Sequence, residues 1–219
     1  MMTLDLSLYA LIDPEHSGGR ALPDLARQVG EGGATLVQLR DKKGTTREMI
    51  ERARELAAAL APLDVPLLVN DRVDVALAAE ADGVHIGQDD MPAADARLLL
   101  GRTAIIGLSI KTIAQAQEAP LEALDYVAIG GVYATTSKDN TSAPIGLDGL
   151  RQIVGTIRLR APNMPICAIA GINESNAADV IAAGADGVAV ISALSLARDP
   201  MAAAEALRVV IDAALAKRK

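Results

Sequence analysis

Aromatic residues are nearly absent from this 219-residue chain, which has three tyrosines, no phenylalanine and no tryptophan. Its core must therefore be aliphatic, and recognition of single-stranded nucleic acid by stacking bases on aromatic rings is not expected. An excess of positive charge is also missing, since the formal net charge is −7. This balance argues against nucleic acid and anionic membranes as partners, so we expect small-molecule partners.

Cysteine is limited to Cys167, so no disulfide can form within the chain, as is usual in a reducing compartment. We interpret Cys167 as a buried core thiol, because no base adjoins it. The first 30 residues lack the pattern of a signal peptide, and no apolar run reaches membrane length. We therefore expect a cytoplasmic protein. Hydrophobic residues make up 51% of the chain, which suits a single domain over residues 1–219.

Short apolar runs alternate with alanine- and leucine-rich amphipathic segments throughout the chain. The expected strands are 6–12, 36–39, 67–69, 84–86, 104–108, 126–129, 166–169 and 188–191. The expected helices are 22–30, 46–60, 73–80, 93–99, 112–118, 148–159, 174–183 and 200–216. This alternation predicts an α/β fold, the closed (β/α)8 TIM barrel. The sequence Ala-Asp-Gly-Val occurs at 81–84 and again at 185–188, about half a chain apart. This repetition indicates either a half-barrel repeat or the chance recurrence of a common turn.

Carboxylates follow two neighbouring strands of this predicted barrel. Asn70 and Asp71 follow strand 67–69, and Asp89 and Asp90 follow strand 84–86. Strand ends of a parallel barrel meet at one face, where oxygen ligands can hold Mg²⁺ against a substrate phosphate. Alternatively, Asp71 caps the next helix and Asp89-Asp90-Met-Pro forms a turn.

Cationic and hydroxyl side chains occupy other strand ends. Gln38 and Arg40 share one face of strand 36–39, and Lys42 follows in the loop, which suggests a diphosphate site. Ser109 follows strand 104–108, where it either donates to a phosphate oxygen or caps the next helix.

The long stretch 130–146 contains Thr135, Thr136, Ser137 and Lys138, which suit an oxyanion, although it could also be an exposed polar loop. The loops after the last two strands contain Gly171 and Ile191-Ser192. In such barrels these loops frequently bind a phosphate, so a second phosphate site is implied.

The two histidines do not complete a catalytic triad or a zinc motif. His85 lies within strand 84–86, and we interpret it as an imidazole with satisfied hydrogen bonds inside the barrel. We place His16, beside Gly18-Gly19, at the surface.

In this order the motifs resemble those of the thiamine phosphate synthase family, over a span from Tyr9 to about Pro200. The motifs are Gln38-Leu-Arg-Asp-Lys42, Val69-Asn-Asp71, His85-Ile-Gly-Gln-Asp-Asp90, Gly107-Leu-Ser109, Thr135–Lys138, Ala170-Gly-Ile172 and Ile191-Ser192. The resemblance implies a transferase of thiamine biosynthesis. It joins 4-amino-2-methyl-5-hydroxymethylpyrimidine diphosphate to 4-methyl-5-hydroxyethylthiazole phosphate, and it releases pyrophosphate through a carbocation-like species.

The resemblance also assigns residues to each ligand. The pyrimidine diphosphate is held by Gln38, Leu39, Arg40, Asp41, Lys42, Asn70, Ser109 and Lys138. The thiazole phosphate is held by Thr135, Thr136, Ser137, Gly171, Ile191 and Ser192. Mg²⁺ is the implied cofactor, held by Asp71 and Asp90. Arg40, Lys42, Ser109 and Lys138 would stabilise charge on the leaving group.

One departure is Ala170, where the family commonly has glycine. A second is the loop sequence Tyr-Ala-Thr-Thr-Ser at 133–137, where the family commonly has a proline before the first threonine and a later threonine. Two alternatives stay open: a thiazole tautomerase-like isomerase and a non-catalytic barrel that binds a phosphate ligand. Asp71, Asp90, Arg40 and Lys138 argue against the isomerase, which lacks a diphosphate site. The sequence leaves open whether copies of the chain form a homo-oligomer.

Overall fold

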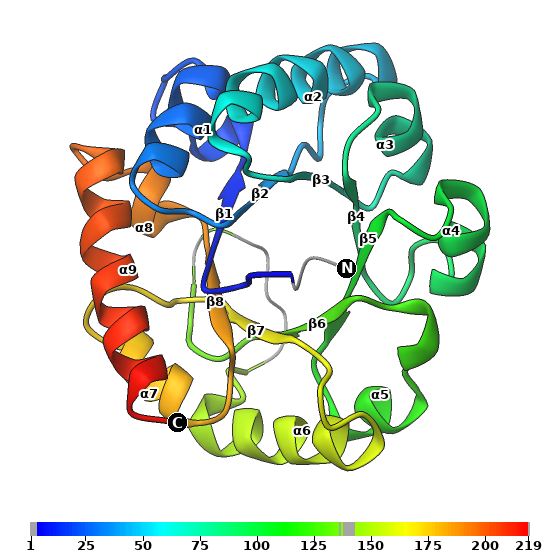
Figure 1. Ribbon diagram of the computed structural model, residues 1–219, viewed down its shortest axis with the longest axis vertical. Helices are drawn as coiled ribbons and strands as arrows, with labels where there is room; N and C mark the ends of the chain where they lie inside the picture. Colours follow the sequence, from blue (N-terminus) through cyan, green and yellow to red (C-terminus); the bar gives the residue numbers. More distant parts are fainter. Residues whose placement is uncertain (1–3, 136, 138–142, 219) are drawn as a thin grey trace.

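The computed structural model describes residues 4–135, 137 and 143–218, and within them eight parallel strands close into a barrel with helices outside it (Figure 1). The strands are β1 (Leu8–Ile12), β2 (Leu36–Leu39), β3 (Leu67–Asn70), β4 (Gly83–Ile86), β5 (Ile105–Ile110), β6 (Tyr126–Gly130), β7 (Ile166–Ile169) and β8 (Gly187–Val190). Each strand pairs with the next along the chain, and β8 closes the barrel against β1. The predicted α/β TIM barrel is confirmed, with strand ends within two residues of those expected.

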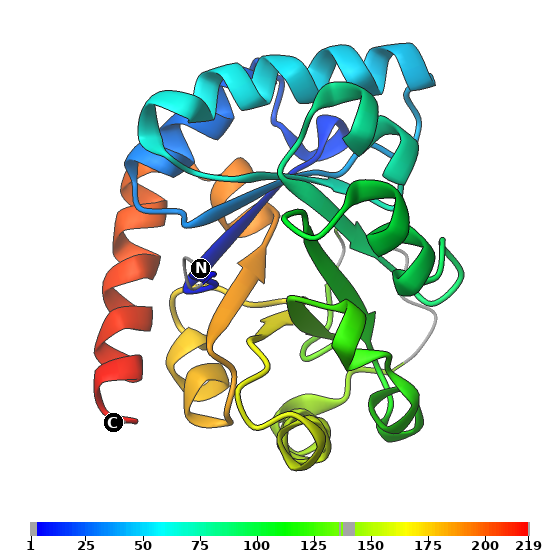
Figure 2. The same ribbon diagram turned by 45° about the vertical axis from the view of Figure 1, so that its right-hand side comes forward.

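The helices of the described residues follow the strands in turn. They are α1 (Leu22–Glu31), α2 (Thr46–Leu60), α3 (Val73–Ala79), α4 (Ala93–Leu100), α5 (Ile113–Glu118), α6 (Gly146–Arg160), α7 (Ala177–Ala182), α8 (Ser192–Ser195) and α9 (Pro200–Ala216). Short 3₁₀ turns lie at Pro14–His16, Ala61–Leu63 and Leu121–Ala123. Figure 2 shows α2, in cyan, and α9, in orange to red, covering two sides of the barrel. None of these helices is long and apolar enough to cross a bilayer.

Two helices depart from the prediction by more than two residues at either end. Residues 192–195 form the short helix α8, which was not expected. Helix α7 begins three residues later than predicted, because Asn173 and Asn176 side chains bind backbone N–H groups in a turn before it. Asparagine often competes with helical hydrogen bonds in this way.

The core has two parts, because successive side chains of each strand point to opposite faces. One part fills the space between the strands and the helices. The other lies inside the barrel and includes Tyr9, Leu36, Leu68, Tyr126 and Cys167. Cys167 is fully buried there, as predicted. Inside the barrel, the side chains near the C-terminal ends of the strands lie beneath the candidate site. The expectation of one domain over residues 1–219 stays a prediction.

The N-terminal end of the barrel repeats one hydrogen bond four times. The residue before each even-numbered strand accepts the backbone N–H near the start of the preceding strand. The pairs are Thr35 with Leu8 (3.2 Å), Asp82 with Leu67 (2.8 Å), Asp125 with Ile106 (2.8 Å) and Asp186 with Ile166 (2.9 Å). The two Ala-Asp-Gly-Val sequences supply two of these pairs, so their repetition reflects a shared structural role.

Candidate active site

Two neighbouring cavities open at the C-terminal ends of the strands. The first, of about 420 Å³, contains Asp71, Asp89 and Asp90, and we call it the aspartate cavity. The second, of about 490 Å³, is lined by Thr135, Ser137 and Ser192 among others, and we call it the hydroxyl cavity. Ile169 and Ala170 line both, so the two cavities share one wall.

Asp71 occupies a left-handed backbone position, with φ +62°, directly after β3. Its N–H donates to the carbonyl of His85 (2.7 Å), which ties the end of β3 to β4. Its carboxylate forms an ion pair with Lys42. The helix-cap alternative for Asp71 is wrong, because α3 begins after Arg72 and no side chain caps it.

Burial raises the pKa of the Asp71 carboxyl above its ordinary value. The ion pair with Lys42 opposes this rise, and the neighbouring carboxylate of Asp90 adds to it. Two carboxylates that face each other in a partly buried site favour binding of a cation between them.

Asp90 also stabilises the turn that follows β4, because its Oδ2 accepts the N–H of Gly87 (2.7 Å). The turn alternative is therefore correct for this one oxygen. Within the described residues, no three histidine, cysteine, aspartate or glutamate side chains gather as a metal cluster. A pair of carboxylates still fits Mg²⁺, which is commonly held by one or two carboxylates together with substrate phosphates and water. The donor set is therefore compatible with the predicted metal.

Arg40 lines the aspartate cavity directly after β2, and Lys42 lies beside it. The Arg40 guanidinium forms an ion pair with Asp13, a carboxylate that is 1% exposed and follows β1. This pair fixes Arg40 at the cavity wall. Asp13 was missed from the sequence, although its place at a strand end matches that of Asp71. Lys111, just after β5, also lines the cavity and was missed.

Three predicted residues of this segment do not line either cavity. Leu39 packs in the outer core between the strands and the helices. Burial pushes the pKa of Asp41 upward, but hydrogen bonds from the backbone of Gly44 and Lys43, together with Arg52, outweigh it and leave that pKa lowered. The carboxylate of Asp41 thus bonds its own loop and Arg52 of helix α2, and it does not face the cavity. Gln38 lies inside the barrel, 1% exposed.

Ser109 lines the aspartate cavity at the end of β5, together with Asn70 at the end of β3. The helix-cap alternative for Ser109 is wrong, because Thr112 caps α5. His85 is buried inside the barrel and bonds Ser109 Oγ through Nε2 (2.9 Å) and the Tyr126 hydroxyl through Nδ1 (2.8 Å). The interpretation of His85 as an imidazole with satisfied hydrogen bonds is confirmed.

Two buried amide atoms near the site have no hydrogen-bond partner among the described residues: Asn70 Nδ2 and Gln38 Oε1. A buried polar atom without a partner costs free energy, so native proteins usually pair it with a ligand or water. Asn70 lines the aspartate cavity, and its free amide is therefore available to a ligand there.

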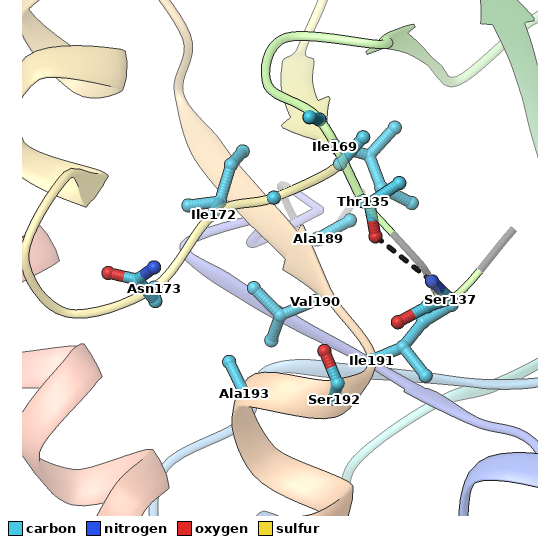
Figure 3. A pocket seen from close by; sticks show the side chains of 13 residues that line it. Thr135, Ser137, Ile169, Ile172, Asn173, Ala189, Val190, Ile191, Ser192 and Ala193 are labelled. Atoms are coloured by element: carbon cyan, nitrogen blue, oxygen red, sulfur yellow. Dashed lines mark hydrogen bonds between the residues drawn. The ribbon is translucent and has the colours of Figure 1, made fainter. Parts of the chain in front are cut away.

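The hydroxyl cavity brings together three loops that are distant in sequence. Figure 3 shows Ser137 beside Ile191, with Thr135 above them and Ser192 below, while Ile172 and Asn173 lie on the opposite side of Val190. Ser137 donates its backbone N–H to Thr135 Oγ1 (3.2 Å) and is 6% exposed, so it is not part of a fully exposed loop. The predicted residues Thr136 and Lys138 lie outside the residues that the structure describes.

Helix α8 begins at Ser192, so its first backbone N–H groups lie at this cavity. The first N–H groups of a helix have no partners within the helix. Gly171 also lines the cavity, in a left-handed conformation with φ +66°. A Cβ there would meet the Ala134 carbonyl at 2.5 Å, so glycine is needed for this close approach.

Ala170, which departs from the resembled family, adopts a left-handed conformation with φ +88°. This region favours glycine, because a Cβ is crowded by the backbone there. The added methyl therefore strains the wall that the two cavities share.

The chain is similar over nearly its whole length to known proteins of one family. The family model described as thiamine monophosphate synthase matches residues 8–194. Thiamine-phosphate synthase of Agrobacterium fabrum is 48% identical over 219 residues, covering 100% of both chains. The enzyme of Chloroflexus aurantiacus is 49% identical over 95% of this chain and 94% of its own. The solved thiamine phosphate pyrophosphorylase of Pyrococcus furiosus is 38% identical, with a TM-score of 0.84, covering 97% of this chain and 98% of that one.

Proposed function

The chain belongs to the thiamine monophosphate synthase family, and we propose that its aspartate cavity binds the pyrimidine diphosphate while its hydroxyl cavity binds the thiazole phosphate. The activity is that of a transferase in thiamine biosynthesis. It joins 4-amino-2-methyl-5-hydroxymethylpyrimidine diphosphate to 4-methyl-5-hydroxyethylthiazole phosphate and releases pyrophosphate. We further infer that it acts in the cytoplasm on these small molecules, in keeping with its single cysteine and net charge of −7.

The observation that carries the assignment of the cavities is their shared wall at Ile169 and Ala170. Carboxylates and cations line one side, as a diphosphate with a metal ion requires. Hydroxyls and the start of α8 line the other, as a lone phosphate requires. Two substrates bound on either side of this wall would hold their reacting atoms close together, which lowers the entropic barrier to the reaction.

During the reaction the bond between the pyrimidine methylene carbon and its diphosphate oxygen breaks, and the electron pair leaves with pyrophosphate. The thiazole nitrogen then forms a new bond to that carbon. Arg40, held by Asp13, and Lys42 would stabilise the negative charge that grows on the leaving group, and Ser109 would donate to it. We assign the same role to Lys138, which the structure does not describe.

We propose Asp71 and Asp90 as the residues that hold Mg²⁺. Bound Mg²⁺ would neutralise charge on the departing pyrophosphate oxygens. Asn70, beside Asp71 at the end of β3, would donate its free amide N–H to the same diphosphate. Thr135, Thr136, Ser137, Gly171, Ile191 and Ser192 are the proposed contacts to the thiazole phosphate. Leu39 and Asp41 would contact the pyrimidine diphosphate through backbone atoms, since their side chains do not line the cavity.

The isomerase alternative is not favoured, because the similar proteins named above are synthases and the chain retains the carboxylate pair and Arg40. The binding-protein alternative predicts that no pyrophosphate is released. Both alternatives are separable from the synthase by one assay.

The assay combines the purified protein with Mg²⁺ and both substrates, and measures thiamine phosphate and pyrophosphate. We expect the two products in equal amounts and neither product when a substrate is omitted. Isomerisation of the thiazole without metal or pyrimidine would contradict the synthase. Lys42→Met should raise KM for the pyrimidine diphosphate alone, and Ser192→Ala should raise KM for the thiazole phosphate alone. The reverse pattern would exchange the two cavities.

A further inference from the structure

A chain of hydrogen bonds crosses the inside of the barrel and ends at the aspartate cavity. It connects Gln38, Tyr9, Tyr126, His85 and Ser109, which come from five different strands. The hydroxyls of Tyr9 and Tyr126 are 3.0 Å apart, and Tyr126 OH lies 2.8 Å from His85 Nδ1. The His85 ring stacks on Tyr126, with ring centroids 5.6 Å apart, which holds the imidazole in place.

The direction of this chain follows from its first member. Gln38 presents Nε2 to Tyr9 OH, and Nε2 can only donate; the reversed amide, with Oε1 at this position, would reverse the direction of every bond in the network. The Tyr9 oxygen therefore accepts from Gln38, and its own proton goes to Tyr126. The Tyr126 oxygen accepts this hydrogen bond from Tyr9, and the Tyr126 hydroxyl donates its own proton to Nδ1 of His85. Since Nδ1 accepts, the proton of a neutral His85 is on Nε2, and it is donated to Ser109 Oγ.

Burial keeps the two phenols protonated, as this order requires. It raises the pKa of Tyr9 and that of Tyr126 well above their ordinary value. If Nδ1 instead carried a proton, Tyr126 would have to donate back to Tyr9. With the Gln38 amide in this orientation, the Tyr9 hydroxyl proton would then have no acceptor in the hydrogen-bond network. The arrangement with His85 protonated on Nε2 alone leaves no proton of the chain unpaired before Ser109.

We propose that Tyr9, Tyr126 and His85 are positioning residues that present the Ser109 hydroxyl to the aspartate cavity as a hydrogen-bond donor. Ser109 Oγ already accepts from His85, and within the described residues no acceptor for its own proton is recorded. The oxygens of a diphosphate accept such a bond. That this ligand is a pyrimidine diphosphate rests on the proposed function.

The first test measures the protonation of His85 in the protein without substrates, by NMR of ¹⁵N-labelled histidine. The chain has two histidines, so His16→Gln assigns the His85 signals by removing the others. We expect a protonated Nε2 and an unprotonated Nδ1. A proton on Nδ1, with or without one on Nε2, would overturn the proposal. This result does not depend on enzymatic activity, and the protonation of His85 is measured in the unaltered protein, with His16→Gln used only to assign the signals.

The second test measures binding of inorganic pyrophosphate with Mg²⁺ by calorimetry. Tyr126→Phe and Ser109→Ala should each weaken binding about fivefold to tenfold, the effect of one lost hydrogen bond. The double variant should bind no more weakly than Ser109→Ala, because both changes remove the same interaction. Tyr133→Phe is the control, because it removes a tyrosine hydroxyl that is not part of this hydrogen-bond network. This variant should bind pyrophosphate as tightly as the unaltered protein does.

Two further outcomes are decisive. Unchanged pyrophosphate binding in a folded Tyr126→Phe protein would overturn the positioning role. Failure of the unaltered protein to form thiamine phosphate would overturn the proposed function instead, and would leave the NMR and pyrophosphate results to decide the hydrogen-bond chain.

Discussion

Lys42 and Asp71 form an ion pair with each other at the mouth of the barrel, between Nζ and Oδ2. One was predicted to bind the diphosphate and the other to bind the metal ion. A ligand that combines Mg²⁺ with a diphosphate can replace both halves of this pair at once, because it offers each residue a partner of opposite charge. The ion pair thus places the predicted diphosphate-binding residue and the predicted metal-binding residue in direct contact.

Replacing Asp71 or Asp90 with asparagine removes one of two facing carboxylates. If the pair holds Mg²⁺, each variant should lose ~10²–10³ in kcat/KM, the usual cost of one charge-stabilising group. Raising the Mg²⁺ concentration should recover part of this loss. The measurement is kcat/KM against Mg²⁺ concentration.

Asp89→Asn is the matched control, because Asp89 adjoins Asp90 and lines the same cavity but is not a proposed ligand. We expect it to stay within a few-fold of the unaltered protein. Near-normal activity of both Asp71→Asn and Asp90→Asn would rule out the metal site.

Ala170→Gly should stabilise the folded protein, because glycine relieves the strain at φ +88°. We expect a gain of ~1 kcal/mol in the free energy of unfolding, measured by urea denaturation. The same change should lower KM for the thiazole phosphate, since the methyl group of Ala170 lines the hydroxyl cavity and narrows it. Equal stability in the two proteins would show that this backbone accommodates alanine without strain.

Gly107→Ala should destabilise the barrel, because a Cβ there would overlap the ring of Tyr126. Displacing a fully buried ring costs ~1–3 kcal/mol, and it should also break the hydrogen bond from Tyr126 to His85. The control is Gly155→Ala on helix α6, where a Cβ meets no atom within 4 Å. That change should stabilise the helix by ~1 kcal/mol. Similar melting temperatures for the two variants would contradict this packing.

Asp125→Ala and Asp186→Ala should lower stability without changing KM for either substrate, because both residues lie at the end of the barrel opposite the site. Each carboxylate accepts a strand N–H and also bonds arginine: Asp125 bonds Arg97 (2.5 Å), and Asp186 bonds Arg158 (2.5 Å) and Arg218 (2.9 Å). We expect a loss of ~2–3 kcal/mol from either change. Asp82→Ala, which removes one strand hydrogen bond, should cost ~1 kcal/mol. Equal costs at Asp82 and Asp125 would show that the arginine contributes nothing.

The sequence determined the barrel and the face that carries the candidate site. Strand positions followed from short apolar runs, because burial on both faces of a parallel strand requires them. The rule that strand ends meet at one face then selected Asp71, Asp90, Ser109 and Arg40, and all four line one cavity. These inferences needed no knowledge of side-chain contacts, since they depend on local pattern and on the direction of the strands.

The tertiary structure alone decided which partners these residues have. Asp13 holds Arg40 across two strands, and Tyr9 meets Tyr126 across the inside of the barrel, 117 residues away in sequence. A sequence gives no signal for such pairs, because closure of the barrel brings together strands that are far apart along the chain. The same is true of Ser109. The sequence predicts that its hydroxyl lies at the strand ends, but its hydrogen bond to His85 forms only once the strands have closed into a barrel.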